Sequence, residues 1–295
     1  GRITIKRFLK KLYAYLPLKK HLYSAIKAVV MVPSDIYRHL HFRGAFNVRN
    51  LRGADFKIFH HGNSVENDIF WSGLYGAWEK DSLRVWSLLA EDSTVIFDVG
   101  ANTGVYSLLA KSTNKASSVY AFEPIPKIFD KLTLNARLND FDLQAENLAL
   151  SNFTGESIIY DTKGAHSYSA SLDKNFRGSD HDLEEIPVNC MRLEDYIRLH
   201  GIAHIDLMKI DVETFEAEVL EGMGEFLGKF RPNILVEILT DEIASRIESL
   251  VAHLGYSYIN LDENGSFELC DTLTASKFHN FLICHPDVAQ KILHI

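Results

Sequence analysis

Short apolar runs alternate with helical stretches along the chain from residue 94 onward. The apolar runs predict the following β-strands: Val95–Val99, Val119–Phe122, Leu143–Leu150, Asp206–Ile210, Ile234–Leu239, Tyr256–Leu261 and Phe278–Cys284. Helical periodicity predicts these helices before and between them: residues 76–90, a helix from Gly104, Ile125–Asn139, Thr214–Met223 and Asp241–Leu254. Strands separated by helical patterns of about 10–15 residues are typical of β-α-β units. We therefore expect an α/β fold with a mostly parallel sheet that is covered on both faces.

The first 75 residues have a different pattern. Residues 3–31 predict one or two amphipathic helices interrupted near Pro17. Residues 44–70 carry glycine and asparagine among alternating polar and apolar positions, which predicts a small sheet or a hairpin. The expected organisation is a basic N-terminal helical extension with a small sheet over residues 1–75, followed by one main domain over residues 76–295.

Charge is distributed unevenly along the chain. The net charge is −8, but residues 1–52 contain twelve basic residues and one acidic residue, a local charge of +11, so the remainder carries −19. An acidic body of this kind excludes broad binding to nucleic acid. The basic segment has two open interpretations. It is either a helix packed on the body with a solvated basic face, or a contact for an anionic membrane surface or an anionic partner.

Cysteine usage and hydropathy indicate the compartment. Cys190, Cys270 and Cys284 are far apart, and an odd number does not form a closed set of disulfides. Their spacing does not match a zinc site. No run of 18 apolar residues predicts a membrane span, and we recognise no export signal. We expect a cytoplasmic protein, located at the membrane surface if the basic segment contacts lipid.

The stretch from Thr94 to Ser107 carries the first candidate site. A hydrophobic strand runs into a turn containing Gly100 and Gly104 and then into a helix. Glycines allow a sharp turn and a close approach of the backbone to a ligand, and the helix N-terminus suits an anionic group. The spacing is G-x-x-x-G, because residue 102 is Asn, so the dinucleotide fingerprint is missing. Alone, the turn is also compatible with a purely structural role.

Glu123 makes the turn more specific. It ends the next predicted strand, nineteen residues after Gly104. In this architecture an acidic residue at that place accepts hydrogen bonds from ribose hydroxyls. The glycine turn and Glu123 together predict an adenosine site.

Three ordered motifs carry a family resemblance. D-V-G-A-N-x-G at residues 98–104, A-F-E-P at residues 121–124 and L-M-K-I-D-V-E at residues 207–213 resemble the FkbM family of S-adenosylmethionine-dependent methyltransferases. Further matches are Trp78-Glu79, Ala149-Leu-Ser151 with Gly155, and Ser169–Leu172, so the resemblance covers about residues 76–284. Thr214 departs from the pattern, since the family usually has glycine there. A helix starting at that point would tolerate threonine.

The resemblance has consequences for fold and cofactor. It implies the Rossmann-like class I methyltransferase fold, with a seven-stranded sheet and an antiparallel last strand. It implies S-adenosylmethionine as cofactor and transfer of its methyl group to a hydroxyl of a small-molecule or glycan acceptor, such as a saccharide or a secondary metabolite. Carried over by position, these residues would bind the cofactor: Asp98, Gly100, Asn102 and Gly104 at the methionine part, Glu123 at the ribose, Asn147 at the adenine edge, and Glu79 closing the site.

Methyl transfer to a hydroxyl also needs a base or a metal ion to take up the proton. Asp211 and Glu213 follow the fourth predicted strand and Glu237 lies within the fifth, where the carboxyl ends of parallel strands meet. Each has an alternative interpretation: Asp211 as a helix N-cap, Glu213 as a first-turn residue, and Glu237 as a paired buried charge. Asp211 with Glu237 or Asp241 would also be compatible with Mg²⁺, although two or three oxygens do not select that ion and we favour no metal.

A long polar segment, residues 161–187, separates the third and fourth predicted strands. Its length suggests a lid or an acceptor-binding loop. His166 in this segment is the best histidine candidate for a base, and a solvated position is its alternative. Two rival functions remain at this point: a nicotinamide-dependent oxidoreductase, and a non-catalytic adenosine-binding module recruited by its basic segment. The sequence does not reveal the oligomeric state.

Overall fold

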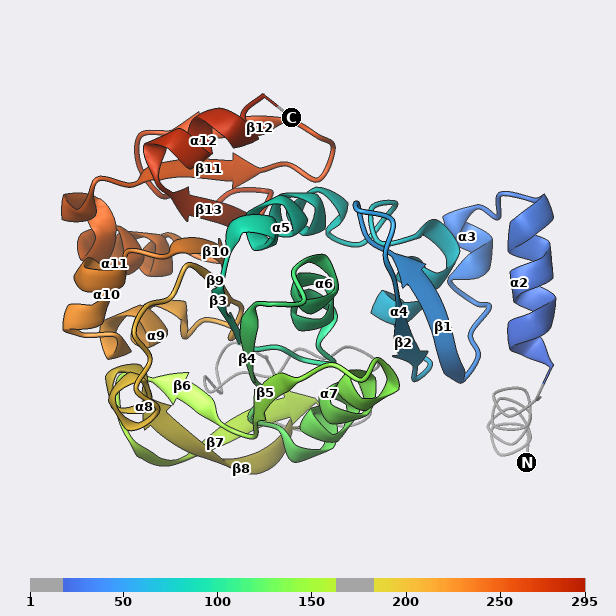
Figure 1. The fold of residues 1–295 in the computed structure, drawn as a ribbon, viewed down its shortest axis with the longest axis horizontal. Helices are drawn as coiled ribbons and strands as arrows, with labels where there is room; N and C mark the ends of the chain where they lie inside the picture. The colour runs from blue at the N-terminus through green and yellow to red at the C-terminus, as the bar shows by residue number, and fades with distance from the viewer. Residues whose placement is uncertain (1–17, 163–182, 295) are drawn as a thin grey trace.

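A computed structural model describes residues 18–162 and 183–294 of the chain (Figure 1). Its centre is an eight-stranded mixed sheet in the order β12-β11-β13-β10-β9-β3-β4-β5. The strands of this sheet are β3 (Val95–Val99), β4 (Ser118–Phe122), β5 (Leu143–Glu146), β9 (Leu207–Ile210), β10 (Asn233–Glu237), β11 (Ser257–Leu261), β12 (Phe267–Cys270) and β13 (Asn280–Cys284). Five neighbours, β10 to β5, run parallel, while β13 lies antiparallel between β10 and β11. The expected parallel sheet with an antiparallel last strand is confirmed.

The expected count of seven strands is wrong. The additional strand β12 pairs with β11 at the edge of the sheet, after a turn at Asp262–Ser266. Its residues Phe267–Cys270 are largely exposed and show little alternation, so periodicity does not reveal it. The predicted strand Leu143–Leu150 is also wrong, because it divides into β5 of the central sheet and β6 (Ala149–Ser151) of another sheet.

That second sheet has three strands, β6-β8-β7, in a region where the sequence analysis predicted no separate sheet. β7 (Gly155–Thr162) and β8 (Leu183–Arg192) pair antiparallel, and β6 pairs parallel with β8. The ends of the predicted lid segment are therefore strands. His166 and Ser169–Leu172 lie outside the described residues, so their expected roles stay predictions.

Helices cover both faces of the central sheet (Figure 1). The helices are α2 (Lys19–Val29), α3 (Ser34–Tyr37), α4 (Ser64–Ser72), α5 (Lys80–Asp92), α6 (Val105–Thr113), α7 (Pro126–Leu138), α8 (Leu193–Leu199), α9 (Glu216–Gly222), α10 (Glu225–Phe230), α11 (Asp241–Val251), the short 3₁₀-helix η2 (Ala252–Leu254) and α12 (Pro286–Ile292). None of those helices is long and apolar enough to cross a bilayer.

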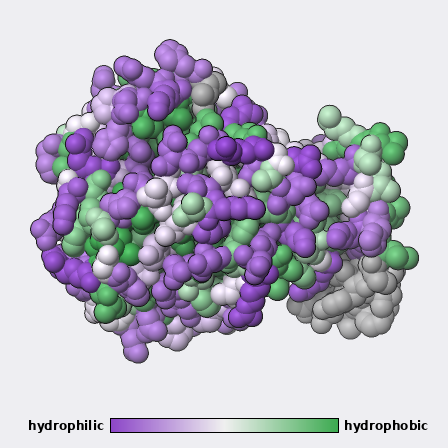
Figure 2. Space-filling model, in the orientation of Figure 1, coloured by the Kyte–Doolittle hydropathy of each residue, from purple (hydrophilic) through white to green (hydrophobic). Residues whose placement is uncertain are grey.

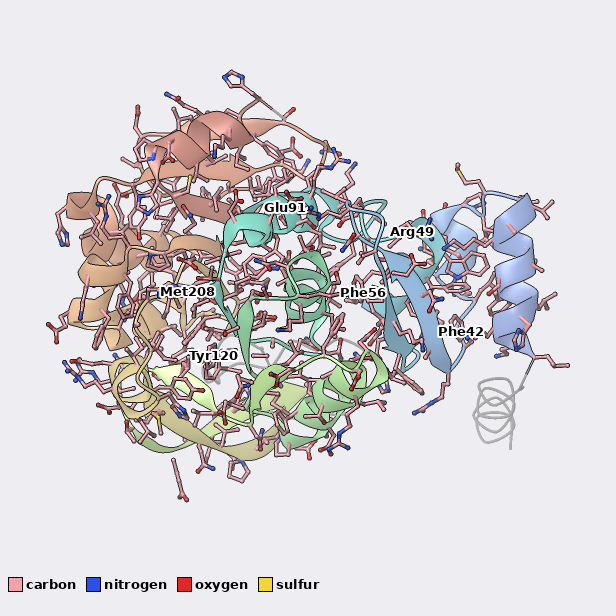
Figure 3. The ribbon with its side chains drawn as sticks, in the orientation of Figure 1. Phe42, Arg49, Phe56, Glu91, Tyr120 and Met208 are labelled. Atoms are coloured by element: carbon pink, nitrogen blue, oxygen red, sulfur yellow. The ribbon has the colours of Figure 1, made fainter. Side chains whose placement is uncertain are left out.

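Alternate strand residues enter two different cores, as expected for strands buried on both faces. Ile96 and Leu207 pack with α5, α6 and α12, whereas Phe97 and Met208 pack with α8 to α11. Figure 3 shows Met208 on the side of α9 to α11 and Phe56 on the opposite side of the sheet.

The N-terminal part packs onto the α5–α6 side. The predicted hairpin is confirmed: β1 (Gly44–Arg49) and β2 (Asp55–His60) pair antiparallel. Helix α2 confirms the end of the predicted helical region at residues 3–31, of which residues 3–17 lie outside the described part. Buried residues of α2, the hairpin and α4 share one core cluster with α5 and α6. The boundary between residues 75 and 76 stays a prediction.

Candidate functional site

The glycine turn after β3 is shaped by the protein's own backbone. Gly100 has φ +82°, and a Cβ there would overlap the carbonyl oxygen of Asp211. Gly104 has φ +91°, and its Cβ would overlap the side chain of Leu132 in α7. Close packing against backbone therefore requires glycine at residue 100, whereas at residue 104 the positive φ favours glycine and a Cβ would displace the end of Leu132. This packing brings the motif at residues 98–104 directly beside the motif at residues 207–213.

Glu123 holds this turn in place. Its Oε2 accepts a hydrogen bond from the backbone N–H of Asn102 at 3.0 Å, and its Oε1 accepts one from the N–H of Ile125 at 2.9 Å. The side chain is buried, and burial raises the pKa of Glu123 to about 7 despite these two bonds. Each carboxyl oxygen has a second lone pair, so the group can also accept from a ligand.

Glu123 faces a cavity at the carboxyl edge of the sheet, which we call the Glu123 cavity. Five residues from the sequence analysis line it: Gly100, Asn102, Glu123, Asp211 and Glu213. Apolar side chains complete its walls, among them Phe122, Leu148 and Ile159 of β7. A carboxyl group beside apolar walls suits a purine nucleoside, whose base is largely apolar on its faces and whose ribose carries hydroxyl donors.

A second cavity adjoins the first, and we call it the Lys209 cavity. Gly100, Asn102 and Asp211 line both cavities, so the two lie side by side. The remaining lining residues include Val65, Trp78, Asp98, Tyr106 and Lys209. Val65 and Trp78 come from segments before the first motif, which means that the N-terminal part helps to build the site.

Lys209 is the buried cation of this cavity. Its Nζ lies 2.7 Å from Asp211 Oδ2 and 4.6 Å from the centroid of the Tyr106 ring. Burial opposes its charge, but the carboxylates of Asp211 and Glu79 outweigh burial and raise the pKa of Lys209. The sequence analysis missed this residue. A lysine inside the apolar run L-M-K-I carried the same signal as Glu237, since an unpaired charge in a buried strand is costly.

Asp98 has an unused oxygen. Its Oδ2 accepts a hydrogen bond from Ser107 Oγ at 2.5 Å, whereas its buried Oδ1 has no hydrogen-bond partner among the described residues. The side chain is only 1% exposed, and burial raises its pKa. A buried oxygen without a donor is unusual. It fits a ligand that brings a positively charged donor, such as the α-ammonium group of S-adenosylmethionine.

Glu79 lies beside the same cavity. The Tyr106 hydroxyl donates to Glu79 Oε2 at 2.5 Å, and burial raises the pKa of Glu79 to about 6, with Lys209 opposing that shift. Glu79 also has φ +42° immediately before α5. The first turn of α5 is held by Glu263, whose carboxyl group accepts from the backbone N–H of Asp81 at 2.8 Å and from Ser82 Oγ at 2.5 Å.

The proposed structural alternatives for Asp211 and Glu213 are wrong. Helix α9 begins at Glu216, with Phe215 as N-cap, so Asp211 is no N-cap and Glu213 is outside the first turn. The predicted helix start at Thr214 is wrong for the same reason. Glu213 and Thr214 have φ +53° and +86°, so the chain turns twice through the left-handed region before α9 can begin.

Glu216 stabilises the loop between β9 and α9 through hydrogen bonds. The sequence analysis missed this residue. Its Oε1 accepts from the backbone N–H groups of Val212 at 3.1 Å and Thr214 at 3.2 Å. The side chain is fully buried, and burial raises its pKa to about 8. An acidic residue at an apolar position of the helical pattern was the available signal.

Glu237 ends β10, and its carboxyl group interacts with those of Asp211 and Glu213. Burial, followed by the negative charges of Asp211 and Glu213, raises the pKa of Glu237 to about 9. Asp241, the alternative to Glu237 as the expected partner of Asp211 for Mg²⁺, lies in the first turn of α11 and accepts from the N–H of Ala275. Among residues 18–162 and 183–294, no group of three or more His, Cys, Asp or Glu side chains is placed to hold a metal ion.

Asn147 does not line either cavity. Its Nδ2 donates to the carbonyl oxygens of Glu123 and Pro124, each at 2.9 Å, and so ties β5 to the end of β4. Its expected contact with the adenine edge stays a prediction, as do the cofactor-binding and catalytic roles of the other candidate residues.

Comparison with known proteins identifies the family. Residues 98–258 match the methyltransferase FkbM domain. Methyltransferase sdnD of Sordaria araneosa is 30% identical, over 55% of this chain and 73% of its own length. The 31-O-demethyl-FK506 methyltransferase FkbM of Streptomyces tacrolimicus is 33% identical, over 44% of this chain and 60% of its own length. The hexuronic acid methyltransferase AglP of Haloferax volcanii is 27% identical, over 50% of this chain and 58% of its own length.

The family match covers more than half of the chain and includes all three motifs. The chain therefore spans the region that defines the family, although it matches only about three fifths of the length of two of these relatives. The alternatives of a nicotinamide-dependent oxidoreductase and of a non-catalytic module do not agree with this match. This chain belongs to the FkbM family of S-adenosylmethionine-dependent methyltransferases.

Proposed function

We propose that the protein transfers the methyl group of S-adenosylmethionine to a hydroxyl oxygen of an uncharged saccharide or saccharide-bearing metabolite, with Asp211 as the general base. The names of two relatives support a saccharide or metabolite acceptor, since one names 31-O-demethyl-FK506 and the other a hexuronic acid, which carries a carboxylate. The uncharged state of the acceptor rests on the carboxyl groups of the site. The observation that carries the proposal is the position of Asp211, which lines both the Glu123 cavity and the Lys209 cavity.

The residues at the two cavities fit the cofactor. When bound, S-adenosylmethionine supplies a methyl group on a positively charged sulfur, whose carbon–sulfur bond breaks as the new carbon–oxygen bond forms. Glu123 would accept hydrogen bonds from the ribose, and the apolar walls of its cavity would cover the adenine. Asp98 Oδ1 would accept from the ammonium group, which satisfies an otherwise unpaired buried oxygen.

Asp211 is suited to accept the proton of the acceptor. A sugar hydroxyl is a weak nucleophile, so a base must take its proton as the methyl group arrives. Asp211 Oδ2 accepts from Lys209 Nζ at 2.7 Å, and no described residue donates a hydrogen bond to Oδ1. Lys209 therefore fixes the orientation of the carboxylate and leaves one oxygen for the acceptor.

Glu237 has a different role in this proposal. With a pKa of about 9 it holds its proton at neutral pH, so it is a hydrogen-bond donor and not a base. This differs from the sequence-based expectation of a base at this position. Burial next to Asp211 and Glu213 is the physical reason.

The charge of the site supports an uncharged acceptor. Among the described residues, three carboxyl groups, those of Asp211, Glu79 and Asp98, act on Lys209. The charges of Asp211 and Glu213 act on Glu237 beside them. An acceptor carboxylate placed there would be repelled, whereas a sulfonium is attracted. We therefore expect neutral hexosides to be methylated in preference to hexuronates.

The test uses two matched variants. Asp211→Asn retains an oxygen for Lys209 but is no base, so kcat should fall about 10²–10⁴-fold while the Kd for S-adenosylmethionine changes less than about threefold. Glu237→Gln keeps a neutral donor and should retain most of the turnover at pH 7. Transfer of labelled methyl groups to neutral hexosides and to hexuronates measures activity, and calorimetry measures cofactor affinity.

Thermal unfolding confirms that both variants are folded before their kinetics are compared. Full activity of Asp211→Asn contradicts its role as base. A consistent preference for hexuronates contradicts the uncharged acceptor.

A further inference from the structure

The outer face of α2 is apolar. Leu18, Leu22, Ala25 and Val29 follow one another at positions i, i+4, i+7 and i+11, which places them on one side of the helix. Leu18, Leu22 and Val29 are 72%, 58% and 83% exposed. The opposite side of α2 packs into the core through Tyr23, which is 4% exposed. The helix therefore has one apolar face toward the protein and another toward the outside.

Neighbouring residues extend this face into a patch. Val30, Met31 and Ile36, after the end of α2, are 56%, 94% and 54% exposed. Together with Leu18, Leu22 and Val29 they form what we call the α2 patch, which contains six of the eleven exposed large hydrophobic residues in the described part of the chain. Figure 2 shows hydrophobic residues gathered at the upper right of the molecule, where α2 ends and α3 follows in Figure 1. Clustered exposed apolar side chains indicate an interaction surface.

The charge around the α2 patch is positive. Residues 18–52 contain seven basic residues and only one acidic residue, Asp35, and residues 1–17 contain five basic residues and no acidic one. Five of the seven basic residues in 18–52 are already engaged. Lys19 is buried and donates to the carbonyl oxygen of His41, and Lys27 donates to that of Phe70. Arg38, Arg49 and Arg52 pair with Asp35, Asp55 and Glu91 at 3.8, 2.7 and 3.8 Å. Lys20 and His21 lie on α2 itself, two and one positions before Leu22, so neither shares the face of Leu22. The remainder of the chain carries −19, so the molecule has a basic end and an acidic body.

We infer that the α2 patch docks onto an anionic lipid bilayer. Helix α2 lies at the outermost edge of the N-terminal part, opposite the central sheet (Figure 1). An apolar helix face with basic neighbours can lie in the headgroup region, where the aliphatic side chains enter the acyl boundary and the cations meet anionic headgroups. The acidic body is repelled by the same surface, which fixes the basic end toward the lipid.

Charge distinguishes this occupant from two others. A second copy of the chain would bring the same positive residues to the patch, so two copies would repel each other at this end. Residues 1–17 contain nine apolar residues and five basic residues with no acidic one, so their charges would be repelled by the basic end in the same way. An anionic bilayer is attracted by all of these charges, and its interfacial region accommodates a convex helix without a preformed groove.

The experiment is vesicle flotation with the full chain. Vesicles of phosphatidylcholine alone are compared with vesicles that also contain phosphatidylglycerol. We expect at least about tenfold stronger partitioning onto the anionic vesicles, weakened by added salt. The double variant Leu22→Glu/Val29→Glu should lower that partitioning at least about tenfold, because it places two carboxylates in the inserted face.

A matched control replaces exposed apolar residues of the acidic body. Leu199 and Leu269 are 70% and 57% exposed, and Leu199→Glu/Leu269→Glu should leave vesicle binding unchanged. All four positions are at the surface, so unfolding temperature and methyl transfer should remain as in the unchanged protein.

Four outcomes overturn the inference. Equal binding to neutral and anionic vesicles removes the role of charge, and unchanged binding of Leu22→Glu/Val29→Glu removes the role of the patch. Light scattering that shows a dimer lost in this variant, or cross-links from residues 1–17 to the patch in the presence of vesicles, assigns the patch to protein instead of lipid.

Discussion

Replacing Thr214 with glycine is expected to stabilise the protein. Thr214 lies between β9 and α9 with φ +86°, a region that β-branched residues rarely adopt. Its backbone N–H donates to Glu216 Oε1 at 3.2 Å, so the loop holds the residue in this conformation. Glycine retains that N–H and has no side chain to oppose the positive φ. The expectation that threonine is tolerated at a helix start fails here, because the helix begins two residues later.

The size of the effect follows from two opposing contributions. A non-glycine residue in such a conformation costs about 1–3 kcal/mol in the folded state. Glycine increases the backbone entropy of the unfolded chain, which costs about 0.5–1 kcal/mol. The difference predicts a gain of about 0.5–2 kcal/mol in the free energy of unfolding. For a chain of this size that corresponds to a rise in Tm of about 1–5 °C.

Calorimetric or fluorescence-detected melting of three variants measures this gain. Thr214→Ala keeps a Cβ atom at the positive φ and should gain less than Thr214→Gly. Thr133→Gly, in the middle of α7, is the matched control and should lower Tm, because glycine weakens a helix interior. A Tm for Thr214→Gly that falls as it does for Thr133→Gly would refute the reasoning about backbone strain.

Two further changes test the carboxyl groups of the site. Glu123→Ala should weaken S-adenosylmethionine binding at least about tenfold, because the ribose loses its acceptor. It should also lower the free energy of unfolding by about 2–4 kcal/mol, because the N–H groups of Asn102 and Ile125 lose their acceptors. Unchanged affinity by calorimetry well below Tm rules out the ribose contact. Burial raises the pKa of Glu216 from 4.5 to about 8. Between these two pH values the folded state keeps a proton that the unfolded state releases. This group therefore lowers the free energy of unfolding by about 1.4 kcal/mol for each pH unit between pH 4.5 and about 8. Glu216→Gln cannot ionise and should flatten the dependence of unfolding free energy on pH in urea titrations; parallel curves for the two proteins would contradict the assigned burial.

Much of the candidate site was predictable because it follows strand ends. Asp98, Glu123 and Asp211 each come at or directly after an apolar run, and parallel strands bring their carboxyl ends to one edge of a sheet. The structure brings Asp98 and Asp211 to one cavity and Glu123 and Asp211 to the other. Lys209 and Glu216 were overlooked although each is a charged residue in an apolar pattern. The same argument that selected Glu237 applies to both.

Other parts were not predictable from local pattern. The apolar run Leu143–Leu150 is continuous in sequence, yet β5 and β6 join different sheets, because periodicity reports a buried strand but not its neighbour. Glu263 holds the start of α5 from a position 182 residues after Asp81, with no signal near either residue. The short edge strand β12 follows Glu263. The sequence analysis missed it because its buried and exposed positions do not alternate.

The sequence by itself determined the alternation of strands and helices, the glycine turn, the acidic residues at the strand ends and the family. These features depend on the period of the backbone and on short motifs, which the chain carries locally. Only the tertiary structure decided which carboxyl groups share one buried lysine, which oxygen of Asp98 lacks a donor, and which carboxyl groups keep their protons near neutral pH. Those properties depend on the distance between groups far apart in sequence and on the exclusion of water around them.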